Sequence, residues 1–244
     1  MKTKATSKSG GDFPVLVLFD IDCTLLNADG AGMASLVEAG QVLYGDTFTA
    51  DGVEFAGRLD PLIVRDLLVA NGQVVAREAE QAMRRGYREA LSRRLSEAGA
   101  ARPLPGAVAL AAELRRTPGV TVGLLTGNFP ETGAIKLRAA GIDPEVFELA
   151  AWGDSSPHDP PAREHLAPVA IAAHERLKGA RLGAEQVIVI GDTPHDVACA
   201  RASGCRALAV ATGRYTCADL AAADLAVEDL GDMGEMLRWI LQKA

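Results

Sequence analysis

Four aspartates stand directly after two apolar runs of the sequence, and their types and spacing could hold a metal. The runs are Val15–Phe19 and residues 187–190, and the acids are Asp20, Asp22, Asp192 and Asp196. Unbroken apolar runs of this kind indicate strands buried on both faces of a parallel sheet, and ligands bind at the carboxyl ends of such strands. Carboxylates gathered there repel one another unless a cation lies among them. Because oxygen ligands suit Mg²⁺ better than zinc, we predict a magnesium site formed by these acids.

Three of the acids have a second interpretation. Asp20 and Asp22 alone could simply begin a turn, a common use of aspartate, but the second acidic pair favours a site. Asp196 ends the segment Thr193-Pro194-His195-Asp196, which has the form of a capping box with proline at the first helical position. Capping and service to the metal are compatible, so both roles stay open for Asp196.

A third polar segment follows the apolar run Val120–Leu125. It consists of Thr126, Gly127 and Asn128 and precedes a predicted helix over residues 130–140. A hydroxyl and backbone amides at a helix N-terminus can bind phosphate. The alternative is a capping segment without a ligand.

These segments require an α/β fold with a doubly wound parallel sheet, since strands and helices alternate from residue 103 onward. Further strands are predicted over residues 147–152 and 206–211, and helices over 104–116, 162–178, 194–202 and 233–242. Residues 27–101 show only helical spacing, over 33–43, 58–70 and 74–98. We therefore predict an inserted all-helical cap domain over 27–101, a core formed by 13–26 and 102–244, and a disordered leader over 1–12.

Composition narrows the range of partners. The 244 residues carry a net charge of −7, which argues against nucleic acid as the main partner. No apolar stretch is long enough to cross a membrane, and the four cysteines form no disulfide or metal pattern. We expect a cytoplasmic protein.

The three strand-end motifs, D-x-D-x-T, T-G-N and G-D-T-x-x-D, together resemble the phosphatase branch of the haloacid dehalogenase-like (HAD) superfamily. The resemblance implies a Rossmann-like core with a helical cap inserted after the first motif. It assigns Asp20 as the nucleophile, and Asp22 as the general acid and base whose backbone carbonyl also contacts Mg²⁺. It assigns Asp192 as a metal ligand.

The family's third motif is a single cation that holds phosphate and nucleophile together, and two residues compete for it here. Arg163 follows the proline-rich loop over 155–161, and Lys136 lies within the helix after Thr126. We favour Arg163, because arginine grips phosphate with two parallel hydrogen bonds while a lysine in mid-helix is usually solvated.

Two further positions are singled out by the resemblance. Cys23 stands where the family usually has glycine, which implies a backbone conformation open to a side chain; a small tolerated residue is favoured over a redox switch. Arg58, in Gly57-Arg58-Leu59-Asp60, resembles a cap segment of phosphoglycolate phosphatase-like members. It could meet the substrate or form an ion pair with Asp60 or another acid.

The predicted function is a Mg²⁺-dependent phosphatase that hydrolyses a small phosphate monoester through an aspartyl-phosphate. The substrate is a small phosphorylated metabolite, with phosphoglycolate as the first candidate by resemblance. A sugar-phosphate mutase on the same scaffold is the nearest alternative, and a non-enzymatic phospho-acceptor or binding protein is another. The sequence does not predict the oligomeric state.

Overall fold

The strand β1 (Val15–Phe19) lies at the centre of a parallel sheet in the computed structural model, which describes residues 14–97 and 99–242. In these residues the sheet has six strands in the order β5-β4-β1-β6-β7-β8, and every pairing is parallel. Leu18 of β1 lies opposite Gly123 and Val189. The predicted α/β fold is confirmed. The other strands are β4 (Val120–Leu125), β5 (Leu149–Ala151), β6 (Val187–Gly191), β7 (Arg206–Val210) and β8 (Leu225–Val227).

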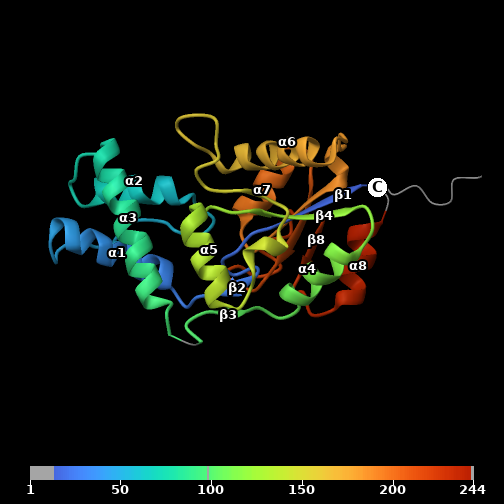
Figure 1. The fold of residues 1–244 in the computed structure, drawn as a ribbon, viewed down its shortest axis with the longest axis horizontal. Helices are drawn as coiled ribbons and strands as arrows, with labels where there is room; N and C mark the ends of the chain where they lie inside the picture. The colour runs from blue at the N-terminus through green and yellow to red at the C-terminus, as the bar shows by residue number, and fades with distance from the viewer. Residues whose placement is uncertain (1–13, 98, 243–244) are drawn as a thin grey trace, which may run out of the picture.

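Helices cover both faces of the sheet, as Figure 1 shows. Alternate residues of a strand point to opposite faces, so the five apolar residues of β1 serve two cores. Val15, Val17 and Phe19 join one apolar cluster, and Leu16 and Leu18 join the other. The first cluster includes residues of α4 (Ala107–Arg116), α5 (Pro130–Ala139) and α8 (Met233–Leu241), and the second includes residues of α6 (Leu166–Lys178) and α7 (Pro194–Ala202).

Three helices form a separate layer beside the sheet: α1 (Ala31–Tyr44), α2 (Asp60–Ala70) and α3 (Arg77–Arg94). We call residues 28–101 the insert. Helices α1 and α3 pack closely. A Cβ atom added at Gly86 of α3 would lie only 2.9 Å from the Cβ of Ala39 in α1. Within the described residues the insert contains no strand, whereas Asn27, the first residue of the predicted cap, lies in the short strand Leu26–Asn27. Its status as a separate cap domain stays a prediction.

A short antiparallel pair closes the base of the insert. β2 (Leu26–Asn27) and β3 (Arg102–Pro103) pair so that Leu26 lies opposite Pro103. The chain therefore enters and leaves the insert at the same place. The predicted leader, residues 1–12, lies outside the described residues.

Most element boundaries lie close to the predicted ones, with three differences. The two-residue strands β2 and β3 were not predicted. The helix predicted over 162–178 is divided into a 3-10 turn (Arg163–His165) and α6. Pro168 lacks an amide hydrogen and is tolerated in the first turn of a helix, which fits a start at Leu166. The strand β8 was not predicted, since its three residues form no extended apolar run. No helix among the described residues has the length and apolar character needed to span a membrane.

Candidate active site

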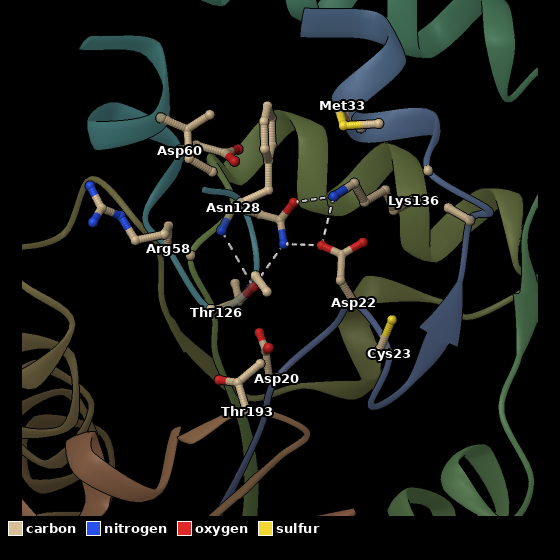
Figure 2. A pocket seen from close by; sticks show the side chains of 18 of the residues that line it. Asp20, Asp22, Cys23, Met33, Arg58, Asp60, Thr126, Asn128, Lys136 and Thr193 are labelled. Atoms are coloured by element: carbon tan, nitrogen blue, oxygen red, sulfur yellow. Dashed lines mark hydrogen bonds and ion pairs between the residues drawn. The ribbon is translucent and has the colours of Figure 1, made fainter. Parts of the chain in front are cut away.

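The loops after β1, β4 and β6 bring the predicted site residues to one edge of the sheet, because these strands are parallel neighbours. Asp20 follows β1, Thr126 follows β4, and Asp192 follows β6. Figure 2 shows Asp20 and Asp22 near Thr126 and Asn128 in one pocket. Residues far apart in the sequence thus form a single site.

Asp20, Asp192 and Asp196 form a buried acidic cluster. One carboxylate oxygen from each lies within 4.8 Å of the others. Burial, followed by repulsion from neighbouring carboxylates, raises the pKa of Asp192 to about 9. Burial also raises the pKa of Asp20, despite the opposing effect of Arg163. A divalent cation would offset this repulsion, and three carboxylates without His or Cys fit Mg²⁺. The Asp22 side chain is not in this cluster, which leaves its backbone carbonyl as its predicted contact with the metal.

Arg163 is the cation beside the predicted nucleophile. Its side chain is buried, and its Nη2 lies 3.3 Å from Oδ2 of Asp20. The same nitrogen donates a hydrogen bond to Oδ1 of Asp196, and Nη1 donates to the carbonyl of Gly57 at 3.2 Å. The favoured candidate for the third motif therefore contacts both Asp20 and Asp196.

Asp196 fills the predicted capping role, and its service to the metal stays a prediction. Its Oδ2 accepts hydrogen bonds from the backbone N–H of Thr193 at 3.1 Å and from the Thr193 hydroxyl at 2.7 Å, which is a capping box. Its Oδ1 faces Arg163. One oxygen thus caps α7 while the other pairs with Arg163.

The expectation that Lys136 is solvated is wrong. Only 5% of its surface is exposed, and its Nζ donates to Oδ2 of Asp22 and to Oδ1 of Asn128, each at 2.6 Å. Burial is the largest single influence and lowers the pKa of Lys136, but Asp22, Tyr87 and Asp60 together raise it more, so the ammonium stays charged. The lysine is buried because α1 covers it: a Cβ atom added at Gly32 would lie 3.3 Å from Nζ. Lys136 contacts the second acid of the first motif, not the nucleophile.

Thr126 and Gly127 line the pocket. Thr126 is fully buried, and its Oγ1 accepts a hydrogen bond from Nδ2 of Asn128 at 2.8 Å. A Cβ atom added at Gly127 would lie 2.1 Å from the carbonyl oxygen of Arg58 and 3.2 Å from Nη1 of Arg163. Only glycine therefore fits this position, where the insert meets the core.

Cys23 corrects one inference from the sequence. Its φ of 55° is in the left-handed region, so the residue adopts the conformation that glycine favours. Two hydrogen bonds hold it there, from its own N–H to the carbonyl of Leu26 at 2.8 Å and from the Thr212 hydroxyl to its carbonyl. Burial, helped by nearby carboxylates, raises the pKa of the thiol to about 12. The scarcity of thiolate favours a tolerated small residue over a redox switch.

Arg58 forms an ion pair, but not with Asp60. Its Nη2 lies 2.6 Å from Oδ2 of Asp66, and in Figure 2 its guanidinium points away from Asp20. Arg58 also borders the cavity described below, and its role toward a substrate stays a prediction.

A cavity of about 300 Å³ lies between the strand ends and the insert. Its core wall is mostly charged or polar and includes Asp20, Asp22, Thr126, Asn128, Lys136, Arg163 and Asp192. Its insert wall is mostly apolar and includes Ala31, Met33, Leu36, Phe55, Ile63 and Tyr87.

Three residues at this cavity were missed by sequence reasoning as site residues: Asp60, Tyr87 and Arg214. Asp60 is buried at the start of α2, and its Oδ2 accepts a hydrogen bond from the N–H of Phe129 at 2.8 Å. The burial of Asp60 and Tyr87 follows from helix packing and left no local signal. Arg214 follows Thr212 and Gly213 at the end of β7, which repeats the T-G pattern after β4 and could have drawn attention to it.

Fold and site together define an α/β enzyme with a cavity at the carboxyl edge of its sheet that is lined by acids and cations. The sequence profile of the haloacid dehalogenase-like hydrolases matches residues 17–201, which is most of the chain. The protein therefore belongs to the haloacid dehalogenase-like hydrolase family, as the three motifs indicated. No curated protein sequence matches the chain.

Several solved structures share the fold. CbbY from Rhodobacter sphaeroides, in complex with phosphate, has a TM-score of 0.73 and 20% identity, over 91% of this chain and 96% of that one. A predicted phosphoglycolate phosphatase from Haemophilus somnus has a TM-score of 0.65 and 18% identity, over 93% and 98%. A putative β-phosphoglucomutase from Thermotoga maritima has a TM-score of 0.59 and 19% identity, over 93% and 100%. At these identities the likeness establishes the fold.

Proposed function

We propose that the protein is a Mg²⁺-dependent phosphatase that hydrolyses a small phosphate monoester. The observation that carries this proposal is the position of Asp20. It is buried at the end of the central strand, borders the cavity, and is flanked by a cation, Arg163, and by two further acids, Asp192 and Asp196.

Magnesium would be held by the carboxylates of Asp20, Asp192 and Asp196 and by the backbone carbonyl of Asp22. When bound, the ion supplies positive charge that neutralises these acids and the phosphoryl oxygens. Arg163 also supplies positive charge to these acids, since its guanidinium contacts Asp20 and Asp196. The hydroxyl of Thr126 and the amides of Gly127 and Asn128 would bind the phosphoryl group, together with Arg163, which we favour over Lys136 because it contacts Asp20.

The reaction has two steps. In the first, a carboxylate oxygen of Asp20 attacks phosphorus, the bond from phosphorus to the ester oxygen breaks, and Asp22 gives its proton to the departing alkoxide. In the second, Asp22 takes a proton from water while the water oxygen attacks phosphorus. The bond to Asp20 breaks, and inorganic phosphate leaves with the enzyme restored.

A mutase is the second candidate, because the fold is shared with a putative β-phosphoglucomutase and the insert covers the cavity. A mutase would exclude water and return the phosphoryl group to a sugar. A phospho-acceptor without catalysis has less support, since it needs neither an acid at Asp22 nor an insert.

The chemistry of the proposed substrate follows from the site. A small phosphorylated metabolite fits the cavity, and phosphoglycolate is our first candidate.

The four cysteines are free thiols, which supports a cytoplasmic location. The negative net charge supports a partner other than nucleic acid.

The test is phosphate release from a panel of phosphoglycolate, sugar phosphates and nucleotides, with Mg²⁺ and with EDTA. We expect release in Mg²⁺ that is lost in EDTA and in D20N. The control is D46N, which removes an exposed carboxylate outside the cavity and should keep full activity. Phosphate release by D20N would refute the mechanism. Conversion of a sugar phosphate into its isomer without phosphate release would identify a mutase.

A further inference from the structure

Asp22 is held by a closed network of hydrogen bonds. Its Oδ2 accepts from Nζ of Lys136 at 2.6 Å and from Nδ2 of Asn128 at 2.8 Å. Lys136 also donates to Oδ1 of Asn128, and Asn128 also donates to the Thr126 hydroxyl. Figure 2 shows that both bonds to Asp22 end on the same oxygen, while the other oxygen points away from them. The two oxygens of Asp22 are therefore not equivalent.

Burial makes this network rigid. Lys136 and Asn128 are 5% and 4% exposed, whereas the Asp22 side chain is 43% exposed and borders the cavity. Charge-assisted hydrogen bonds shielded from water hold a side chain in one orientation. Oδ2 is thus fixed by the protein, and Oδ1 is free of those donors.

The two buried cations of the cavity contact different acids. Among the ion pairs between described residues, Arg163 pairs with Asp20 and Asp196, and Lys136 pairs with Asp22. Two of the three N–H donors of Lys136 are used by Asp22 and Asn128. This geometry differs from that expected of a cation whose task is to grip the phosphoryl group.

We propose that Lys136 and Asn128 are positioning residues that make Oδ1 of Asp22 the atom that exchanges the proton. Oδ1 gives its proton to the ester oxygen as the bond to phosphorus breaks, and later takes a proton from the attacking water. This inference rests on the proposed phosphatase function and adds to it the identity of the working oxygen and of the groups that orient it.

The test compares two leaving groups in the first chemical step. The p-nitrophenolate of p-nitrophenyl phosphate leaves without needing a proton, whereas an alkoxide needs one. Single-turnover release is measured with p-nitrophenyl phosphate and with phosphoglycolate, or with whichever alkyl ester of the panel the wild type hydrolyses faster. In K136M we expect single-turnover release of the leaving group from the alkyl ester to slow by ~10–100-fold, because Asp22 loses a residue that orients it. Release of p-nitrophenol should be nearly unchanged.

Two variants complete the test. K136R restores a donor to Asp22 and should recover part of the alkyl rate. N128A removes the second donor and keeps the charge of Lys136, so it should give the same pattern with a smaller loss. It also decides the question if K136M does not fold, which circular dichroism would reveal.

Equal slowing of both leaving groups in K136M and N128A would overturn the inference, because it would mean that Lys136 serves the phosphoryl group or only the fold. Failure of the proposed function itself is distinguishable, because D20N would then still release phosphate from the esters. A wild-type alkyl rate in K136M would also overturn the inference.

Discussion

The core wall and the insert wall of the cavity differ in chemistry. On the core wall, Lys136 and Arg163 are buried and each is already paired with an acid. The insert wall presents side chains such as Met33 and Phe55, which lack charge. The core wall therefore suits the phosphoryl group that all phosphate esters share, and the insert wall suits the leaving group that distinguishes them. Removal of Arg163 from the first should affect every substrate, and changes to the second should affect substrates differently.

The largest effect is expected on the core wall, for R163M. Removing this cation leaves Asp20 and Asp196 buried together without their partner, and breaking a buried ion pair typically costs about 3–5 kcal/mol. We expect a loss of this size in the free energy of unfolding, measured with denaturant in EDTA, and loss of activity on every ester.

The control for R163M is R201M. Arg201 pairs with Asp224 at 2.9 Å on the surface, where the side chains are 48% and 31% exposed, so its loss should change stability by less than about 1 kcal/mol. Equal stability of R163M and R201M would show that the pairing of Arg163 contributes nothing to the core wall.

A smaller effect, dependent on pH, is expected at Asp60, where the two walls meet. Burial is the main cause that raises the pKa of Asp60 to about 6 from its ordinary 3.8. The folded protein therefore keeps this proton between about pH 4 and pH 6, where the unfolded chain has lost it. The contribution of Asp60 to the free energy of unfolding consequently falls by about 3 kcal/mol as the pH rises through this window. Above the window it stays level.

The measurement is the difference in the free energy of unfolding between D60N and wild type at pH 4, 5, 6 and 7. Asparagine keeps an acceptor for the N–H of Phe129 but does not titrate. We expect the difference to shift in favour of D60N from pH 4 to pH 6. A difference independent of pH would show that Asp60 titrates alike in both states.

The smallest effect is expected on the insert wall, for M33A. Met33 borders the cavity and is 48% exposed, so its truncation removes about 1 kcal/mol of apolar contact from a leaving group that reaches it. We expect KM to rise about 5-fold for esters with an apolar leaving group, with kcat unchanged. V42A is the control, because Val42 lies on the same helix, is 79% exposed and does not border the cavity. A uniform loss of kcat on all esters in M33A would contradict the division between the walls.

The core wall could be predicted from sequence because its residues sit directly at strand ends. Asp20, Thr126 and Asp192 each follow an apolar run, and parallel strands end at a common edge, so local patterns were enough to bring them together. Arg163 was favoured on the chemistry of its side chain and lies beside Asp20.

The surroundings of Lys136 and Asp60 depend instead on how the insert packs. Lys136 lies in mid-helix, and it is buried where α1 passes over it at Gly32. Asp60 looked like a partner for Arg58, but its carboxylate reaches the start of α5, far away in the sequence. Such contacts between helices leave no periodic signal. The left-handed conformation of Cys23 was missed for a related reason, since it is held by Leu26 and Thr212.

The central place of β1 in the sheet has a consequence for folding. Its partners begin at Val120 and Val187, so both of its pairings join distant parts of the chain. Closing such long loops costs entropy and slows folding. Pairing of β2 with β3 brings the ends of the insert together and so shortens the loop to β4. On the ribosome, β1 therefore emerges before both of its partners, and the strand that presents Asp20 stays unpaired until β4 and β6 have been made.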